Sequence, residues 1–180
     1  MIARLKPQRA NTVRLQMAEP VAGQMLQGSD MKRHDKSWWL LYGPGWLLLL
    51  YLVYAQAIPA FNYDLGVTMG TQEPASLVTE VGTAFWYGFA LGDLLTYIPL
   101  LALGLIGHQL GRRWGKVLLA AALGITVYWP AVCLSTIFAA RDAMGWELGN
   151  PLSYWLVLPL IALWAAWGLW HLVNIQTSPS

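Results

Sequence analysis

The stretch VLLAAALGITVYWPAVCLSTIFA, residues 117–139, decides the fold class because it contains no charged side chain. An α-helix rises about 1.5 Å per residue, so about 20 residues cross the roughly 30 Å hydrocarbon core of a bilayer. Three further apolar runs have similar length, and charged residues, Gly, Pro and Asn are concentrated between the runs. These runs are residues 37–58, 83–106 and 153–173.

The composition is also that of a membrane protein. Of the 180 residues, 57% are hydrophobic and 11% are charged, whereas about 25% of the residues of a soluble domain are charged. A water-soluble core cannot bury that much apolar surface. We therefore predict an all-α membrane protein in which residues 37–175 form a bundle of four transmembrane helices.

The positions of Lys and Arg predict the orientation of this bundle, because loops rich in these residues are retained in the cytoplasm. Ten of the eleven basic residues precede the first run or lie in the loop at 107–116, and Arg141 is the eleventh. Both termini are therefore expected on the cytoplasmic side of a bacterial inner membrane, with loops 59–82 and 141–152 outside. The ten are Arg4, Lys6, Arg9, Arg14, Lys32, Arg33, Lys36, Arg112, Arg113 and Lys116.

The amino-terminal residues allow more than one interpretation. Residues 1–36 are mostly polar, so we predict a disordered cytoplasmic tail, with a short second tail at 176–180. Met31 begins a basic segment that leads into the first apolar run, so it is an alternative start of the protein. The same segment also resembles a cleavable signal peptide, which would leave three helices. We favour a retained helix because the run exceeds the usual signal core of about 7–15 residues.

One ionisable residue lies in the middle of an apolar run. Asp93 is about ten residues from either end of run 83–106, where a carboxylate costs about 2.5–3.5 kcal/mol. Thr96 and Tyr97 follow at three and four residues, so we expect all three side chains on one inward face. Intramembrane acids usually serve a function, and we predict a ligand site here. The alternative is a hydrogen bond that pairs two helices.

The third run carries a polar and aromatic stripe that is expected to face Asp93. Thr126, Trp129 and Cys133 recur at helical spacing, and Tyr128 lies on the adjoining face. Trp129, Cys133 and Tyr128 are therefore candidate ligand-binding residues, although small residues such as cysteine more often serve helix packing.

A proline interrupts each of the last three predicted helices. Pro99, Pro130 and Pro159 each remove the backbone bond to the carbonyl four residues earlier. A freed carbonyl in hydrocarbon needs a new partner, so such positions commonly line a cavity.

Several function classes are excluded by what these runs contain. No pair of His, Cys, Asp or Glu has metal-ligand spacing within a run, so we predict no metal site and no cofactor. The net charge of +2 and the lack of a basic stripe interleaved with aromatics argue against nucleic-acid binding. Membrane lipids and a lipophilic small molecule are the expected partners, and a homodimer is left open.

A series of short motifs resembles a known family. The motifs are Ile58-Pro59 with Asp64, Asp93 followed six positions later by Pro99, Gly111-Arg112-Arg113-Trp114, and Tyr128-Trp129-Pro130 leading to Leu134-Ser135-Thr136. In this order, over about residues 38–170, the chain resembles the EXPERA family, which includes the emopamil-binding sterol isomerases and the sigma-2 receptor. The resemblance implies an intramembrane cavity for sterol-like or cationic amphiphilic molecules, with Asp93 and Asp64 as its acids. The histidine expected beside the acid of an isomerase is not evident near Asp93.

Three functions follow from these observations. The first is binding of a lipophilic or cationic amphiphilic ligand, sterol-like or lipid, in a cavity around Asp93. The second is a lipid- or isoprenoid-modifying enzyme, similar to a double-bond isomerase, in which Asp93 transfers a proton. The third is a small transport or membrane-complex assembly subunit in which Asp93 relays protons or clamps helices.

Overall fold

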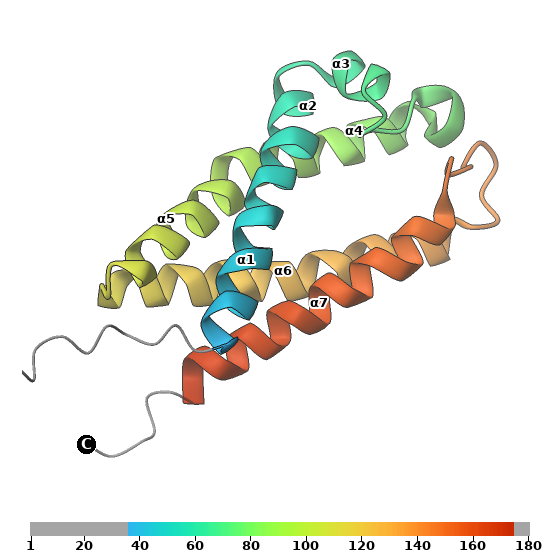
Figure 1. The fold of residues 1–180 in the computed structure, drawn as a ribbon. Coiled ribbons are helices and arrows are strands. Elements are labelled where there is room, and N and C mark those ends of the chain that lie inside the picture. The colour runs from blue at the N-terminus through green and yellow to red at the C-terminus, as the bar shows by residue number, and fades with distance from the viewer. Residues whose placement is uncertain (1–35, 175–180) are drawn as a thin grey trace, which may run out of the picture. The chain divides into compact units, whose positions relative to one another are not determined.

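The structure, a computed structural model, describes residues 36–174. Apart from Lys36, the predicted tails at 1–36 and 176–180, including the alternative start at Met31, lie outside the described residues. Helices make up the described part of the chain (Figure 1), and its nine elements are α1 (Lys36–Leu52), η2 (Val53–Ala57), α2 (Ile58–Phe61), α3 (Tyr63–Thr68), α4 (Ala75–Gly92), η3 (Asp93–Tyr97), α5 (Ile98–Gln109), α6 (Arg113–Ala140) and α7 (Pro151–Asn174). The elements η2 and η3 are π-helical turns.

Four helical segments are long and apolar enough to cross a membrane: Ser37–Phe61, Ala75–Gln109, Arg113–Ala140 and Pro151–Asn174. The prediction of an all-α protein with four transmembrane helices is therefore confirmed. The first segment consists of α1, η2 and α2, and the second consists of α4, η3 and α5.

The second segment begins earlier than the sequence indicated, at Ala75 rather than at residue 83. Its first turns contain Ser76, Thr79 and Glu80, so hydropathy does not mark them as part of an apolar helix. Thr79 breaks the helix locally, with a φ of 64° in the left-handed region that a β-branched residue rarely adopts.

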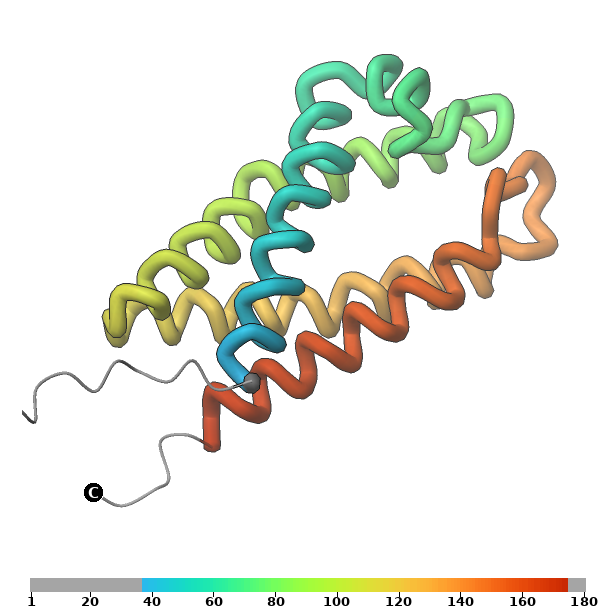
Figure 2. The backbone as a smooth tube through the Cα atoms, in the orientation of Figure 1, coloured from blue at the N-terminus to red at the C-terminus, as the bar shows by residue number. Residues whose placement is uncertain are grey.

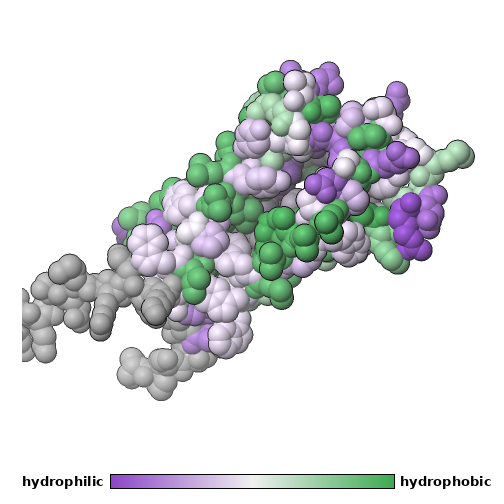
Figure 3. Space-filling view, turned by 45° about the vertical axis from the view of Figure 1, so that its right-hand side comes forward, coloured by the Kyte–Doolittle hydropathy of each residue, from purple (hydrophilic) through white to green (hydrophobic). Residues whose placement is uncertain are grey.

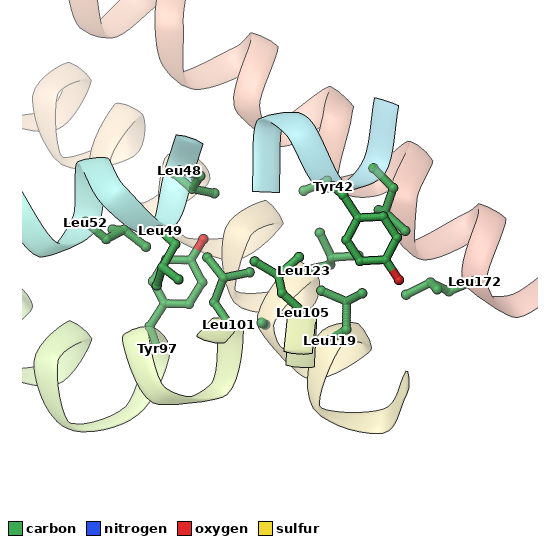
Figure 4. Close-up of a cluster of buried hydrophobic side chains, with 13 residues drawn as sticks. Tyr42, Leu48, Leu49, Leu52, Tyr97, Leu101, Leu105, Leu119, Leu123 and Leu172 are labelled. Atoms are coloured by element: carbon green, nitrogen blue, oxygen red, sulfur yellow. The ribbon is translucent and has the colours of Figure 1, made fainter. Parts of the chain in front are cut away.

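The four segments pack around a leucine-rich core. Helix α5 packs along α6, and α6 packs along α7, while α1 packs on α5 (Figure 1, Figure 2). Leucines from α1, α5, α6 and α7 surround the rings of Tyr42 and Tyr97 (Figure 4). The described residues of loops 62–74 and 141–150 lie at the opposite end of the helices from the α5–α6 turn.

Glycines allow α5 and α6 to approach until their backbones touch. A Cβ atom added to Gly115 would lie 2.1 Å from the carbonyl carbon of Gly107, and one added to Gly104 would lie 2.6 Å from the backbone nitrogen of Leu119. In lipid the hydrophobic effect does not drive helices together, and small residues of this kind allow the close van der Waals packing that does. We call Gly104, Gly107 and Gly115 the glycine seam.

Replacing Gly115 by alanine is expected to destabilise the protein by about 1–3 kcal/mol, the usual cost of overpacking. The added methyl group would meet the backbone of Gly107. Thermal unfolding in detergent, followed by circular dichroism, measures the effect. Gly88→Ala is the matched control, because a Cβ atom at Gly88 meets nothing within 4 Å. Equal Tm values for the two variants would contradict the close packing of the seam.

Candidate functional site

Two π-helical turns contact each other within the bundle and organise the candidate site. The turn η2 precedes Ile58-Pro59, and the turn η3 precedes Ile98-Pro99. Proline has no N–H group and cannot bond to the carbonyl four residues earlier, so the helix widens ahead of it. Such π turns occur frequently at functional sites.

The carbonyl that Pro59 frees has a defined new partner. It belongs to Ala55, and it accepts a hydrogen bond of 2.9 Å from the Nε2 atom of Gln72, in the loop after α3. The bond therefore holds this loop against η2. Pro59 was not among the prolines that the sequence analysis placed inside a helix, yet its freed carbonyl obtains the kind of partner expected there.

Asp93 is the first residue of η3, and its side chain is buried, with 6% of its surface exposed. The prediction that it faces the bundle is confirmed. Its Oδ2 atom has no hydrogen-bond partner in the described part of the protein. The ion pair found there joins two other residues, Arg141 and Asp142, at 3.2 Å on the surface.

Tyr97 and Thr126 fix the position of η3 relative to α6. The Thr126 hydroxyl donates to the Ala122 carbonyl at 2.8 Å, so its oxygen accepts the hydrogen bond from the Tyr97 hydroxyl. Because α6 runs antiparallel to η3, Asp93, which precedes Tyr97, lies on the side of Thr126 toward Trp129 and Cys133. Asp93 is close enough to Cys133 to act on it electrostatically.

A cavity of about 530 Å³ lies beside these residues, toward the loops. Five of its lining side chains are aromatic and none is a lysine, arginine or histidine. Figure 3 shows the surface hollowed near the loops, with hydrophilic and hydrophobic residues beside the hollow. The lining residues are Tyr51, Tyr54, Gln56, Met69, Gly70, Thr71, Gln72, Glu73, Trp86, Trp129, Cys133, Asn150, Ser153, Tyr154, Val157 and Leu158.

Four buried polar atoms around this region lack hydrogen-bond partners among the described residues. They comprise two acceptors and two donors: Gln56 Oε1, Asp93 Oδ2, Trp86 Nε1 and Trp129 Nε1. Each comes from a different element, η2, η3, α4 and α6. An unsatisfied buried polar group costs about 1–3 kcal/mol, so a concentration of four is unusual.

Glu73 joins the two loops above the cavity. Its Oε1 atom accepts a hydrogen bond of 3.3 Å from the backbone N–H of Gly149, and its carbonyl accepts one of 2.9 Å from the Tyr63 hydroxyl. Burial and, second to it, the negative charge of Glu73 raise the pKa of Tyr63 to about 12. The hydroxyl therefore stays protonated at neutral pH and remains a donor.

The structure brings together only part of the predicted site. Asp93, Tyr97, Trp129 and Cys133 are buried on facing helices, as the two stripes indicated. Of these four, Trp129 and Cys133 line the cavity, whereas Asp93 and Tyr97 are not among its lining residues. Thr96, Tyr128 and Asp64 are exposed and do not line it. Tyr128, for example, has 67% of its surface exposed on the outside of α6.

The π turn explains the position of Thr96. In an α-helix, residues three and four positions after Asp93 both share its face. A π turn bonds residues five apart and is wider, so the fourth residue, Tyr97, stays on the inner face while the third turns outward. The expectation of a single face for all three residues assumed a regular α-helix.

Several residues of the site were not predicted from the sequence. Gln56 could have been, because it is a polar side chain near the end of the first apolar run and precedes an Ile-Pro pair like the one that follows Asp93. Trp86 and Tyr154 stack with their centroids 6.4 Å apart, from helices that are not neighbours in sequence. A one-dimensional pattern contains no signal for such a pair.

Comparison with protein-family models, with curated proteins and with solved structures found no match to this chain. The resemblance to the EXPERA family therefore stays a prediction. Within residues 36–174, no group of three or more His, Cys, Asp or Glu side chains is placed to hold a metal ion. The cavity and its side chains are the features from which a function can be inferred.

Replacing Gln72 by alanine is expected to lower the stability of the protein by about 1–3 kcal/mol, because the buried Ala55 carbonyl then loses its partner. Thermal unfolding in detergent again measures the change. Gln109→Ala is a suitable control, since Gln109 is an exposed glutamine at the end of α5. If Gln72→Ala and the control unfold at the same temperature, the hydrogen bond from Gln72 to the Ala55 carbonyl does not stabilise the protein as proposed.

Proposed function

We propose that this protein binds a lipophilic or cationic amphiphilic ligand, sterol-like or lipid, in the intramembrane cavity beside Asp93. The observation that carries the proposal is the group of four unpartnered polar atoms in a transmembrane bundle, three of which belong to the cavity-lining residues Gln56, Trp86 and Trp129. Buried donors and acceptors without partners are retained at a stability cost, and a ligand that supplies the partners gives them a role.

The charges around the cavity favour a cation. Apart from Asp93, every acidic residue in the part of the chain that the structure describes lies at the loop end: Asp64, Glu73, Glu80, Asp142 and Glu147. Arg141 is the one arginine or lysine described there. A surface of one sign raises the local concentration of the opposite ion.

Aromatic walls support the same ligand class. Trp86, Trp129 and Tyr154 line the cavity, and the face of an aromatic ring attracts a cation by about 0.5–2 kcal/mol. The carboxylate of Asp93 offers a charge-assisted hydrogen bond at the level of Trp129 and Cys133. An ammonium group on an apolar body fits this combination.

The charge distribution also supports the proposed orientation in a bacterial inner membrane. The α5–α6 turn carries Arg112, Arg113 and Lys116, whereas the loop end is acidic. The cavity would then lie in the outer half of the bilayer, with the basic turn in the cytoplasm.

Replacing Asp93 by leucine separates the ligand-binding role from a purely structural one. The variant removes a buried acid whose Oδ2 atom has no partner, so the ligand-free protein is expected to gain about 1 kcal/mol of stability or more. Thermal unfolding in detergent measures the change. A large loss of stability would show instead that Asp93 serves to pair helices.

Replacing Asp93 by asparagine tests the binding itself. We expect the affinity for hexadecylamine, measured with radiolabelled amine and protein in lipid nanodiscs, to fall about tenfold or more, because a charge-assisted hydrogen bond is lost. Asp142→Asn is the matched control, since Asp142 is exposed and pairs with its neighbour Arg141. Unchanged affinity in a stably folded Asp93→Asn protein would refute the proposed site.

A further inference from the structure

We infer that the cavity takes a single-chain amphiphile with its polar head inside and its alkyl chain in a gap between α1–η2 and α7 that opens sideways into the bilayer. This inference rests on the proposed function and adds the route and shape of the ligand. It is based on the way in which α1 and α7 cross and then separate.

Helices α1 and α7 touch near the end that carries the chain termini. The indole N–H of Trp164 donates to the Leu40 carbonyl at 2.8 Å. Nearby, a Cβ atom added to Gly45 would lie 3.8 Å from the Trp164 ring, and one added to Gly168 would lie 3.0 Å from Leu41. The two helices are packed closely at this crossing.

Beyond the crossing the two helices diverge (Figure 1, Figure 2). Tyr51 lies about 9 Å along α1 from Gly45, and Tyr154 lies about 15 Å along α7 from Trp164. Helices α1 and α7 are not among the pairs of elements that pack extensively. The distance between the two backbones therefore increases toward the loops, and we call the region between them the wedge.

The cavity extends to both sides of this wedge. Its lining includes Tyr51 and Tyr54 from α1–η2 and Tyr154, Val157 and Leu158 from α7. Tyr51 and Val157 each have half of their surface exposed, at 50%, so these side chains border the cavity and the lipid-facing surface together. Tyr154 is close enough to Tyr51 to interact with it electrostatically.

These residues suit an alkyl chain better than a second polar group. Val157 and Leu158 are aliphatic, and the tyrosine rings offer apolar faces, whereas the lining residues Gln56 and Trp129 are buried and carry unpartnered polar atoms. Both sides of the wedge belong to segments that cross the membrane. A chain that leaves the cavity here reaches hydrocarbon without passing through water.

Replacing Val157 by tryptophan fills one side of the wedge and tests the inference. Hexadecylamine and hexylamine, which share a head group, are compared in the nanodisc binding measurement. We expect Val157→Trp to lower the affinity for hexadecylamine about tenfold, because about two methylene contacts are lost. The affinity for hexylamine is expected to stay nearly unchanged. Leu163→Trp is the control, because Leu163 is exposed on α7 and does not line the cavity.

The outcomes separate this inference from the proposed function. Equal effects of Val157→Trp on both amines, or none on either, would overturn the lateral route while leaving binding at Asp93 intact. Loss of the Asp93 dependence for both amines would overturn the proposed function itself.

A second measurement tests the lateral route without any substitution, in case Val157→Trp fails to fold. A diazirine placed in the middle of the hexadecylamine chain is expected to label the unaltered protein at Tyr51, Tyr54 or Val157. Labelling confined to the loop residues Met69–Glu73 would overturn the lateral route.

Discussion

The structure depends on one constraint, which is that polar groups removed from water must find partners inside the protein. Two Ile-Pro pairs interrupt the first and second transmembrane segments where these segments contact each other, and each interruption widens the helix into a π turn. Pro59 leaves the Ala55 carbonyl without a backbone donor, and the side chain of Gln72 donates to that carbonyl instead. The side chains of Gln56 and Asp93, which the two turns carry inward, are left without full partners. Gln56 lines the cavity, so one of these unpartnered groups contributes to its polar character.

The four transmembrane segments were predictable because each is a continuous apolar run bounded by charged or turn-forming residues. The start of the second segment was not predictable, since residues 75–82 include polar side chains and fold back at Thr79 as part of the loop end. The close packing at Gly115 could not be predicted either, because the sequence does not indicate which residue a glycine in an apolar run will contact. Hydropathy therefore determined the number of helices but not how they pack.

The site was predictable where it depends on helical periodicity and not where it depends on local distortion. Tyr97, Trp129 and Cys133 lie on the inner faces that their spacing indicated. Thr96 does not, because the π turn changes the angle between successive side chains. The contribution of the loops, through Glu73 and Gln72, arises from contacts between segments distant in sequence, such as the bond from Gly149 to Glu73. A single sequence contains no record of these contacts.

The glycine seam has a mechanical consequence for the cavity. Helices α5 and α6 meet backbone to backbone at Gly107 and Gly115, with no side chains between them to rearrange. They therefore form the stiff half of the molecule. Helix α7 packs along α6, whereas α1 meets α7 mainly at one crossing, so changes in the volume of the cavity are expected to come mainly from movement of α1.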